Sequence, residues 1–438
     1  MVAAWPVKRM EDLCEITSSK RIFAADYVSE GVPFYRGREI TEKYKGNLDV
    51  STELFITEEK FREIERKFGA PMQGDLLLTS VGTLGSVYVV KPGDRFYFKD
   101  GNLTWFRHFK ELDSQLLYYW IGSPQGKVEL QKCTIGSSQS AFTIVLLKSM
   151  EIELPPLPIQ QRIAGILSAY DELIENSQRR IKILESMARA LYREWFVHFR
   201  FPGHKNHPRV ASPLGEIPQG WEVKRLEVII ATHIGGGWGK ETPDDDYTEP
   251  AWVIRGTDIP ETRYSQVASV PHRFHSASNL RSRRLVAGDI VFEVSGGSKG
   301  QPVGRTLLVT PELLASLGGD VICASFCKRI QPDVAGYGSE LLYLSFLEGY
   351  ESGEIEQYQV QSTGISNFKW TEYIANTDRV VPPEALREQF RGHVASLFTQ
   401  VATLGRKIQN LRRTRDLLLP RLLSGQIAVE TLPEGVAA

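Results

Sequence analysis

Two long stretches of the chain carry apolar residues at alternating steps of three and four positions. At this spacing, nine of twelve residues between Gln160 and His198 are apolar, and nine of ten between Phe390 and Leu422. A heptad pattern of this length is typical of the seam of a coiled coil, so the sequence predicts two long helices that pack together. The predicted seam residues are Ile163, Leu167, Tyr170, Ile174, Ile181, Leu184, Leu191, Phe390, Val394, Leu397, Val401, Leu404, Ile408, Leu411 and Leu418.

Prolines mark the beginnings and ends of both predicted helices. Pro158 and Pro383 suit the first turn of a helix, where a missing N–H costs little. Pro202 should stop the first helix, Pro420 should kink the second, and Gly425 can end it. Because the residue before a proline is held extended, each helix is expected to begin sharply where a domain ends.

The two helical stretches are also copies of each other. A constant offset of 227 residues carries Ile163 to Phe390 and Ile181 to Ile408. The segments before the helices match more loosely, with varying offsets that indicate loop insertions and deletions. The matching segments are "WPVKRM" and "WEVKRL", "YRGREI" and "IRGTDI", "GDLLLTSVG" and "GDIVFEVSGG", and "TIGSSQSAF" and "STGISNF". The sequence therefore predicts an internal repeat, in which a globular domain is followed by a long helix.

The predicted fold class is α+β, with two globular domains separated by two long antiparallel coiled-coil helices and related by a pseudo-twofold internal repeat. Short β-like runs and glycine-rich turns fill the globular segments. The predicted divisions are globular domains at 1–154 and 221–381, spacer helices at 155–200 and 382–426, a linker at 201–220 and a tail at 427–438. The first helix, from Ile159 to His198, would span about 60 Å at 1.5 Å per residue, and the second would be slightly shorter. The alternative, two core helices of one large domain, is disfavoured because such long heptads are rare there.

Composition adds the broad class of protein. The 438 residues include 42% hydrophobic and 24% charged residues, with a formal net charge of −1, as in ordinary soluble proteins. Four cysteines are too few for a disulfide framework, no apolar run approaches 18 residues, and the N-terminal segment has no apolar signal core. A cytoplasmic protein is the expectation.

The sequence lacks the motifs of the catalytic sites that would act on DNA. The Pro-Pro pairs lack the Asn or Asp that a base methyltransferase needs before them. The segment "HIGGGWGKET" departs from a phosphate-binding loop at Ile234 and Glu241, so it is interpreted as a glycine-rich turn. Cys323 and Cys327 have no second ligand pair at zinc spacing. No catalytic residue, metal site or cofactor site is predicted for this chain.

Two related but different domains on a long spacer suit an elongated ligand with two distinct parts, and duplex DNA is such a ligand. Several segments, together with their order along the chain, carry a resemblance to a known family: "IELPPLPIQQRIAGILSAYDELIE", "VVPPEALREQF", "GEIPQGWEVKRL" and "TRDLLLPRLLSGQI". With the paired "RG" and "GD" elements, they make the chain resemble the specificity subunits of type I restriction–modification systems over nearly its whole length.

The resemblance implies a function as well as a fold. The globular segments would be target recognition domains for a bipartite, asymmetric site in double-stranded DNA. The chain itself would be non-catalytic, and would direct adenine methylation and ATP-dependent restriction by its partners. Those partners would be two modification (methyltransferase) subunits and restriction/translocase subunits, which would carry S-adenosylmethionine, Mg²⁺ and ATP. A coiled-coil protein-interaction scaffold without a DNA role stays open as the alternative.

Candidate DNA contacts come from basic and polar loops. The segment from Pro271 to Thr310 has a net formal charge of +4, typical of a surface that contacts phosphates. Arginine beside a glycine after a short strand can bind guanine, although pairing inside the domain is nearly as good an explanation. A solvated loop is the alternative for the basic segment. The candidate residues are Arg36, Arg38, Thr79, Ser80, Ser137, Gln139, Arg255, Arg273, Arg281, Arg283, Arg284 and Lys299.

Overall fold

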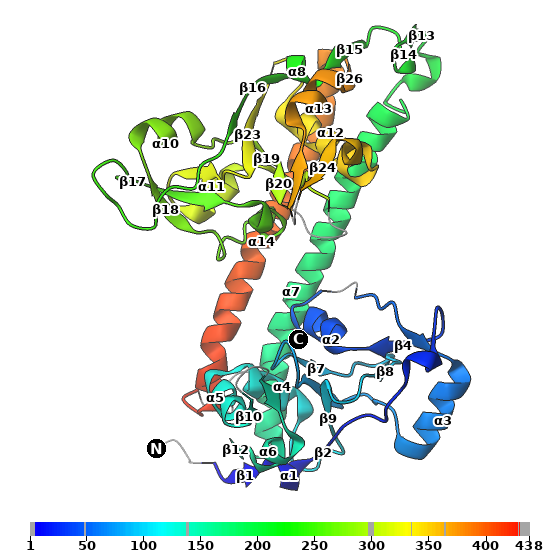
Figure 1. Cartoon of the computed structure of the whole chain (residues 1–438), viewed down its shortest axis with the longest axis vertical. Coiled ribbons are helices and arrows are strands. Elements are labelled where there is room, and N and C mark those ends of the chain that lie inside the picture. Colours follow the sequence, from blue (N-terminus) through cyan, green and yellow to red (C-terminus); the bar gives the residue numbers. More distant parts are fainter. Residues whose placement is uncertain are drawn as a thin grey trace. The chain divides into compact units, whose positions relative to one another are not determined.

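The computed structural model describes residues 5–47, 50–136, 140–296, 302–333, 335–362, 365–427 and 429 (Figure 1). The chain forms two compact units: unit 1 contains Met1–Glu175 and Asn410–Ala438, and unit 2 contains Asn176–Gln409. Helix α7 (Leu157–Tyr192) begins in unit 1 and ends in unit 2, whereas helix α14 (Glu384–Leu423) begins in unit 2 and ends in unit 1. Both long helices therefore contribute to both units, and the predicted α+β class is confirmed.

Unit 1 is built on two four-stranded sheets. The first has the order β2 (Glu15–Thr17), β9 (Leu103–Arg107), β6 (Leu76–Thr79), β7 (Val87–Val89). The second has the order β3 (Tyr27–Val28), β5 (Phe55–Ile56), β4 (Val32–Tyr35), β8 (Tyr97–Phe98). Two further pairs are β1 (Val7–Arg9) with β12 (Glu151–Glu153) and β10 (Thr134–Ile135) with β11 (Ala141–Phe142). The shorter helices are α1 (Met10–Leu13), α2 (Gly37–Tyr44), α3 (Glu58–Phe68), α4 (Ser114–Gly122), α5 (Pro124–Lys132), α6 (Ile144–Ser149) and the 3₁₀ turn η1 (Ala24–Asp26).

Unit 2 contains a four-stranded and two three-stranded sheets. Their orders are β16 (Ile230–Gly235), β23 (Cys327–Pro332), β19 (Ile290–Glu293), β21 (Thr306–Leu308); β18 (His272–His275), β17 (Glu249–Ile254), β22 (Val321–Cys323); and β20 (Ser295–Gly296), β25 (Ile365–Phe368), β24 (Gln359–Ser362). Two pairs complete the strands: β15 (Glu222–Arg225) with β26 (Asp378–Val381), and β13 (Arg209–Ser212) with β14 (Gly215–Pro218). The helices are α8 (Leu226–Ile229), α9 (Ile259–Thr262), α10 (Ala277–Arg283), α11 (Pro311–Leu317), α12 (Ser339–Glu351) and α13 (Trp370–Asn376). Short helical turns are η2 (Arg193–Val197), η3 (His204–Asn206), η4 (Gly256–Asp258) and η5 (Glu354–Tyr358).

The strand order of unit 1 recurs in unit 2. The order β2–β9–β6–β7 corresponds to β16–β23–β19–β21, and the parallel pair β4 and β8 corresponds to β17 and β22. The register corresponds as well, since Leu77 pairs with Trp105 in unit 1 and Val291 with Arg329 in unit 2. These matches confirm the internal repeat that the sequence predicted, and they allow residues of the two units to be compared position by position.

Helices α3 and α10 show how local sequence sets an equivalent element in each unit. The Thr57 hydroxyl accepts the Lys60 N–H at 3.1 Å and caps α3. The Ser276 hydroxyl accepts the Asn279 N–H at 3.4 Å and caps α10. Because a capped first turn satisfies a backbone donor that the helix itself cannot pair, both helices begin at the hydroxyl residue.

The paired "GD" segments form tight turns before β6 and β19. In unit 1, Gly74 has a φ of 87°, a conformation that favours glycine. The Asp75 carboxylate accepts the Met72 N–H at 2.9 Å and the Trp105 Nε1–H at 2.9 Å. Burial raises the pKa of Asp75, because the charged form is desolvated there.

Unit 2 repeats this turn with a different partner for the carboxylate. Gly288 has a φ of 93°. The Asp289 carboxylate accepts the Val286 N–H at 2.9 Å and the Arg329 Nε–H at 2.7 Å. Arg329 occupies the register position that Trp105 holds in unit 1, so the aspartate is common to both turns and its outer partner differs.

In unit 1, the first half of α7 packs against the last turns of α14. Ile163 and Leu167 are fully buried in one cluster with Leu422. Further along α7, Asp171 pairs with Arg415. Residues further along α7 thus contact residues earlier in α14, so the two helices are antiparallel.

In unit 2, the end of α7 packs against the beginning of α14. The rings of Trp195 and Phe390 lie 5.6 Å apart. Earlier in α7, Glu185 accepts the Tyr264 hydroxyl at 2.9 Å, and Gln409 of α14 donates to the carbonyl of the next residue, Ser265. The helices are therefore antiparallel in this unit too, and both contact the segment after α9.

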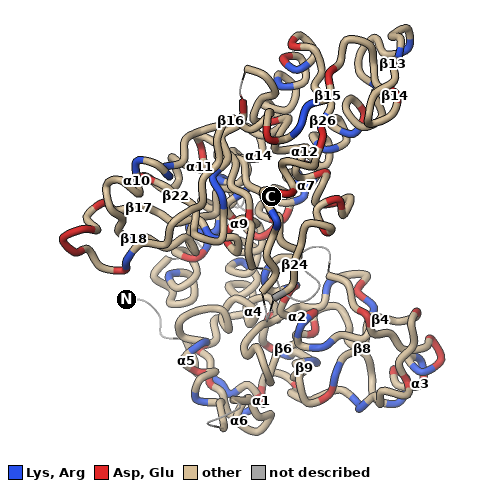
Figure 2. Tube along the Cα trace, turned by 45° about the horizontal axis from the view of Figure 1, so that its top comes forward, with Lys and Arg blue, Asp and Glu red and all other residues tan. Residues whose placement is uncertain are grey.

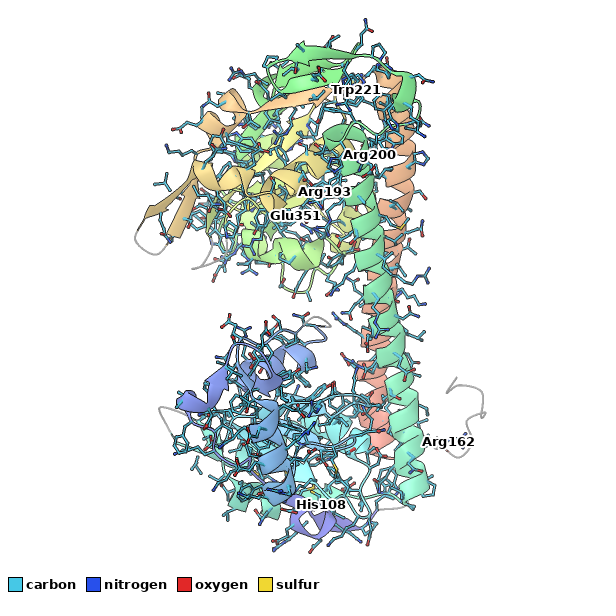
Figure 3. The ribbon with its side chains drawn as sticks, turned by 90° about the vertical axis from the view of Figure 1, so that its right-hand side faces the viewer. His108, Arg162, Arg193, Arg200, Trp221 and Glu351 are labelled. Carbon is cyan, nitrogen blue, oxygen red and sulfur yellow. The ribbon has the colours of Figure 1, made fainter. Side chains whose placement is uncertain are left out.

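The helical turn η2 (Arg193–Val197), which follows α7, also contacts the body of unit 2. Arg193 donates to Glu348 at 2.6 Å and to Glu351 at 2.9 Å, and both acids belong to α12 (Figure 3). Helical structure continues to Val197 as the π-helical turn η2. Gly203 follows with a φ of 88°, just after the proline that was expected to stop the helix.

Equivalent residues near the start of each long helix anchor it to the unit in which it begins. Gln160 is fully buried, donates to the carbonyls of Glu111 and Pro155 at 2.8 Å, and accepts the Asp113 N–H at 2.8 Å. Arg387, which lies 227 positions later, donates to the carbonyls of Ala335 and Gly336. Both side chains satisfy the backbone of a loop before the equivalent helices α4 and α12.

Burial along the helices follows the predicted heptads. None of the predicted seam residues is exposed, whereas Ile183, Met187 and Leu417, at other positions, are more than half exposed. Helix α14 continues past Pro420 to Leu423. Among the described helices, none is both long enough and apolar enough to span a membrane.

Candidate nucleic-acid interface

In unit 1, backbone hydrogen bonds join several strand ends into one edge, which we call the unit-1 edge (residues 18–21, 36–38, 79–80 and 99–102). The Lys99 N–H donates to the Tyr35 carbonyl at 2.8 Å, which links the ends of β8 and β4. The Ser80 N–H donates to the Asn102 carbonyl at 2.8 Å, which links the end of β6 to the same turn. Loops at the ends of parallel strands form a common place for ligand contacts in sheet proteins.

Unit 2 repeats these links in what we call the unit-2 edge (residues 235–238, 255–257, 294–295 and 324–326). The Ala324 N–H donates to the Ile254 carbonyl at 2.9 Å, and the Val294 N–H donates to the Phe326 carbonyl at 2.9 Å. The glycine-rich turn "GGGWG" joins this edge through the Gly237 N–H, which donates to the Cys323 carbonyl at 2.9 Å. The two edges therefore share a backbone framework.

The candidate arginines of unit 1 lie where β4 ends. The Arg36 N–H donates to the Glu39 carboxylate at 2.8 Å, and its guanidinium lies 3.1 Å from the same group. Glu39 is fully buried, and about a third of the Arg36 side chain (36%) stays exposed. Arg38 lies 3.5 Å from Glu39 and is 57% exposed. Arg36 is thus mainly a structural partner, whereas Arg38 also lies beside Glu39 but keeps more than half of its side chain exposed.

Arg255 repeats the role of Arg36 in unit 2. Its guanidinium forms two parallel bonds to Asp258, at 2.9 and 2.8 Å, and donates to the Ser269 carbonyl at 2.8 Å. The hydrogen bonds to Asp258 raise the pKa of Arg255. The explanation of both arginines as paired side chains therefore agrees with the geometry, and 39% of the Arg255 side chain remains exposed.

The candidate hydroxyls of the unit-1 edge are buried. Thr79 is fully buried and its hydroxyl accepts the Ser86 N–H at 2.9 Å. The Ser80 hydroxyl lies 2.6 Å from the Thr104 hydroxyl. Neither residue presents a free hydroxyl at the surface. The candidates Ser137, Gln139 and Lys299 lie outside the described residues.

Arginines of the basic segment in unit 2 are mostly engaged with other parts of the unit. Arg273 pairs with Glu241 at 2.9 Å and stacks over the Trp238 ring at 4.4 Å. Arg283 donates to the Gly235 carbonyl at 2.9 Å. These contacts fix the glycine-rich turn against β18 and α10.

Two more positive residues of this segment meet carboxylates. Arg284 lies 3.5 Å from Asp320, and Arg305 forms two bonds with the buried Glu293 at 2.8 and 2.5 Å. Arg281 is exposed, and no partner is found for it among the described residues. The formal charge of the segment thus overstates its free positive charge, because acids from elsewhere in the chain neutralise part of it. Figure 2 shows positive and negative residues interspersed over unit 2.

Basic side chains are more prominent on the unit-1 edge. Arg21 is 66% exposed and pairs with Asp100 at 2.9 Å. Lys99 lies 3.8 Å from the same carboxylate, and Lys20 stacks over the Phe68 ring at 5.1 Å. Sequence reasoning missed these residues, although the matching of "YRGREI" with "IRGTDI" would have directed attention to the strand ends that adjoin them.

The unit-2 edge instead carries aromatic rings, which were also missed. Trp238 is 39% exposed and Phe326 is 56% exposed. Close to Phe326 in sequence, Lys328 is half-buried, and desolvation lowers the pKa of its ammonium group. The two edges thus offer different chemistry on the same framework.

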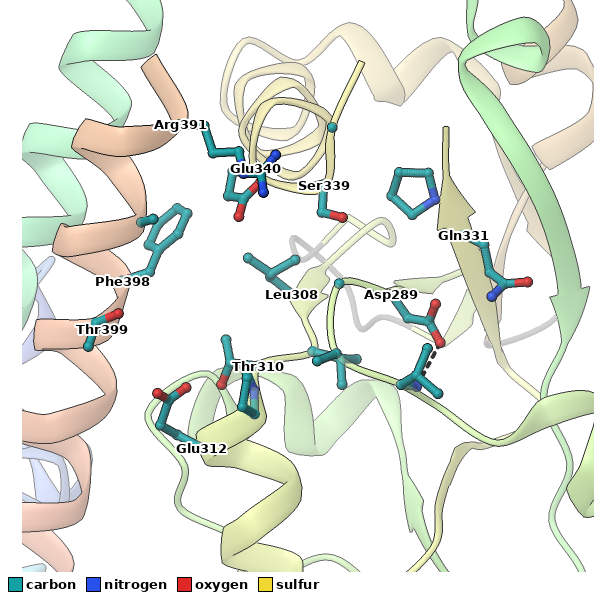
Figure 4. A pocket seen from close by; sticks show the side chains of 18 residues that line it. Asp289, Leu308, Thr310, Glu312, Gln331, Ser339, Glu340, Arg391, Phe398 and Thr399 are labelled. Carbon is teal, nitrogen blue, oxygen red and sulfur yellow. Dashed lines mark hydrogen bonds between the residues drawn. The ribbon is translucent and has the colours of Figure 1, made fainter. Parts of the chain in front are cut away.

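A separate cavity of about 480 Å³ lies between α14 and the body of unit 2 (Figure 4). Ser339, Glu340, Arg391 and Phe398 are among the residues that line it. None of the candidate DNA contacts lines this cavity. Its mixed lining of apolar and oppositely charged groups does not favour one class of ligand.

Metal and thiol chemistry find little support in the described parts of the chain. No group of three His, Cys, Asp or Glu side chains suited to a metal ion occurs there. Cys323 and Cys327 are buried free thiols, and burial raises the pKa of Cys323 to about 12. A thiol that is protonated at neutral pH is a poor nucleophile and a poor metal ligand.

Comparison with known proteins agrees with this architecture. A family model described as "Type I restriction modification DNA specificity domain" matches residues 3–186. The type I restriction enzyme MjaIX specificity subunit of Methanocaldococcus jannaschii is 26% identical to this chain, over 98% of this chain and 94% of its own length. Both matches are to specificity subunits of type I restriction–modification systems, the family that the sequence resembles.

Other specificity subunits match over different lengths. The HindI specificity subunit of Haemophilus influenzae is 23% identical over 65% of this chain and 71% of its own length. The crystal structure of the type I restriction–modification S subunit from M. genitalium has the same fold, with a TM-score of 0.54 at 14% identity. That match covers 95% of this chain and 96% of the other. The prediction that this chain is not itself an enzyme agrees with its likeness to specificity subunits.

Proposed function

We propose that this specificity subunit recognises a bipartite, asymmetric site in double-stranded DNA, with one half-site read by each unit. The observation that carries the proposal is the pairing of a repeated backbone framework with edges of different chemistry. The unit-1 edge has Lys20, Arg21 and Lys99, whereas the unit-2 edge has Trp238 and Phe326. A framework that recurs with different side chains suits a ligand whose two halves have a common backbone and different bases.

The partners follow from what is repeated. Helices α7 and α14 keep one sequence offset and pack antiparallel in each unit, so they suit one partner bound twice. We infer two modification subunits, which would carry S-adenosylmethionine and methylate adenine, and restriction/translocase subunits that would use ATP and Mg²⁺. The exposed cations Arg406 and Lys407 on α14 are candidate docking residues for a modification subunit.

The test is selection of duplexes from a random library by the complex of this chain with its modification subunits. We expect two short conserved elements that differ in sequence and are separated by a gap of fixed length. A single element or a palindrome would contradict the division of labour between the units. Absence of any enriched sequence, with the complex intact by native mass spectrometry, would favour a protein-interaction scaffold instead.

Methylation assays separate the roles of the subunits. The chain alone, supplied with S-adenosylmethionine and the selected duplex, should transfer no methyl group, and the assembled complex should methylate adenine. Methyl transfer by the chain alone would contradict the non-catalytic role.

A further inference from the structure

The turn between β22 and β23 holds an aromatic ring in solvent. The Cys327 N–H donates to the Ala324 carbonyl at 2.8 Å, and the Phe326 carbonyl accepts the N–H groups of Val294 at 2.9 Å and Ser295 at 3.2 Å. These bonds fix the backbone of the turn, yet 56% of Phe326 is exposed. A large apolar side chain in this position adds little burial to the fold, and it offers area to a ligand.

Lys328 lies two residues further on and carries a positive charge. It is half-buried at the start of β23, and no carboxylate pairs with it among the described residues. Desolvation lowers the pKa of its ammonium group, and Lys328 in turn helps desolvation to lower the pKa of His233. A partly desolvated, unpaired charge is unfavourable unless an anion meets it, so Lys328 suits a ligand that carries negative charge.

Unit 1 shows that the fold needs neither side chain. Asn102 occupies the position of Phe326, because its carbonyl accepts the Ser80 N–H just as Phe326 accepts Val294. Thr104 occupies the position of Lys328 in the sheet register, and its hydroxyl is buried against that of Ser80. The same turn and strand therefore form with an amide and a hydroxyl, and the ring and the ammonium group serve something specific to unit 2.

We propose that Phe326 stacks on an unstacked base of the half-site read by unit 2, and that Lys328 binds an adjacent phosphate. This inference rests on the proposed function. A base and its phosphate combine an apolar face with a negative charge, and aromatic wedges between bases are an established means of DNA binding. A modification subunit fits less well, because two copies of one partner would require the same feature in both units. The DNA half-sites differ, as the two edges do.

The experiment uses the complex with modification subunits and the duplex enriched by selection. Phe326→Ala should weaken specific binding about tenfold, the typical loss for one base–aromatic stack. Lys328→Ala should reduce the slope of log affinity against log salt concentration by about one phosphate contact. The matched exchange Phe326→Asn with Lys328→Thr installs the residues of unit 1 and should combine both losses. Val228→Ala, at another exposed apolar residue of unit 2, is the control and should bind as the wild type does.

A fluorescent base locates the contact. With 2-aminopurine placed in turn at each position, the wild-type complex should change the emission at one position of a single half-site, and Phe326→Ala should abolish this change. Wild-type affinity, salt slope and emission in the variants would overturn the inference while leaving the proposed function intact. Loss of a modification subunit from Phe326→Ala, seen by native mass spectrometry, would also overturn it. Failure of the wild-type complex to bind any selected duplex would refute the proposed function itself.

Discussion

Units 1 and 2 place the same backbone turns at the same points of the sheet, but finish them with different side chains. Asp75 and Asp289 each accept an N–H from the residue three positions earlier, at 2.9 Å in both units. Beyond that bond, Asp75 meets the indole of Trp105, whereas Asp289 meets the guanidinium of Arg329. The backbone contact is what the turn requires, and the second partner is free to change as long as it donates a hydrogen bond.

The unit-1 edge and the unit-2 edge also share backbone hydrogen bonds and differ in their side chains. Backbone bonds that hold the turn after β8 recur after β22, while Lys99 and Asn102 are replaced by Ala324 and Phe326. A stable framework with interchangeable side chains is the arrangement expected where specificity differs between two copies.

The largest expected difference between the units concerns the two aspartates. Asp289→Asn should lower the free energy of unfolding by about 3 kcal/mol, because it leaves the nearly buried Arg329 without its counter-charge. Asp75→Asn should cost about 1 kcal/mol, since the partner of Asp75 is a neutral indole. Urea unfolding of the full chain measures both values. Equal losses would show that the two turns are energetically alike and that the arginine makes no difference.

The second-largest difference is expected between the side chains that anchor the two long helices, Gln160 and Arg387. Gln160→Leu should lower the free energy of unfolding by about 2 kcal/mol, because it leaves buried backbone groups of Glu111, Asp113 and Pro155 unpaired. Arg387→Leu should cost about 1 kcal/mol, since its partly exposed partners can bind water. The same unfolding assay applies. A larger loss for Arg387→Leu than for Gln160→Leu would contradict this ranking of the two side chains.

Acid should affect the two units in opposite directions. Burial lowers the pKa of the His275 imidazole in unit 2. The contribution of this group to the free energy of unfolding is therefore fully present above its pKa in the unfolded state, about 6.5, and is lost as the pH falls through its lower pKa in the folded state. Burial raises the pKa of the Asp75 carboxyl group in unit 1. The contribution of this group to the free energy of unfolding is therefore present below its pKa in the unfolded state and is lost as the pH rises through its higher pKa in the folded state. Hydrogen exchange, followed separately in each unit from pH 7 to pH 4, measures both.

Two variants serve as controls for this pH dependence. His275→Asn should reduce the acid sensitivity of unit 2 and leave unit 1 unchanged, whereas Asp75→Asn should act only on unit 1. A uniform response of both units to either substitution would contradict the assignment of the effect to these two groups.

The smallest effect is expected for the ion pairs between α7 and α12. Glu351→Gln removes partners of Arg189 and Arg193, which are all partly exposed, so the loss should stay below about 1 kcal/mol. Thermal unfolding in low and high salt checks this, because the difference from the wild type should shrink as salt screens the pairs. A loss comparable to that of Asp289→Asn would reveal a much stronger coupling of α7 to the body of unit 2.

The sequence by itself determined the elements that rest on periodicity and on special backbone residues. Heptads predicted both long helices and which side chains, such as Ile163 and Phe390, would be buried. The offset of 227 residues and the paired "GD" turns predicted the repeat, because glycine at positive φ and an aspartate that accepts a nearby N–H are local requirements. Such features can be predicted from a sequence because the residues that form them are close together along the chain.

Only the tertiary structure decided which of the candidate contacts are free. Summed charge could not reveal that Glu241 and Asp320 neutralise Arg273 and Arg284, because each pair is formed by residues more than thirty positions apart. Nor could the pattern reveal that Phe326 is exposed, since the exposure of a side chain depends on packing by distant segments. Burial and pairing are properties of three-dimensional neighbours, whereas hydrophobic period and turn residues are properties of the chain.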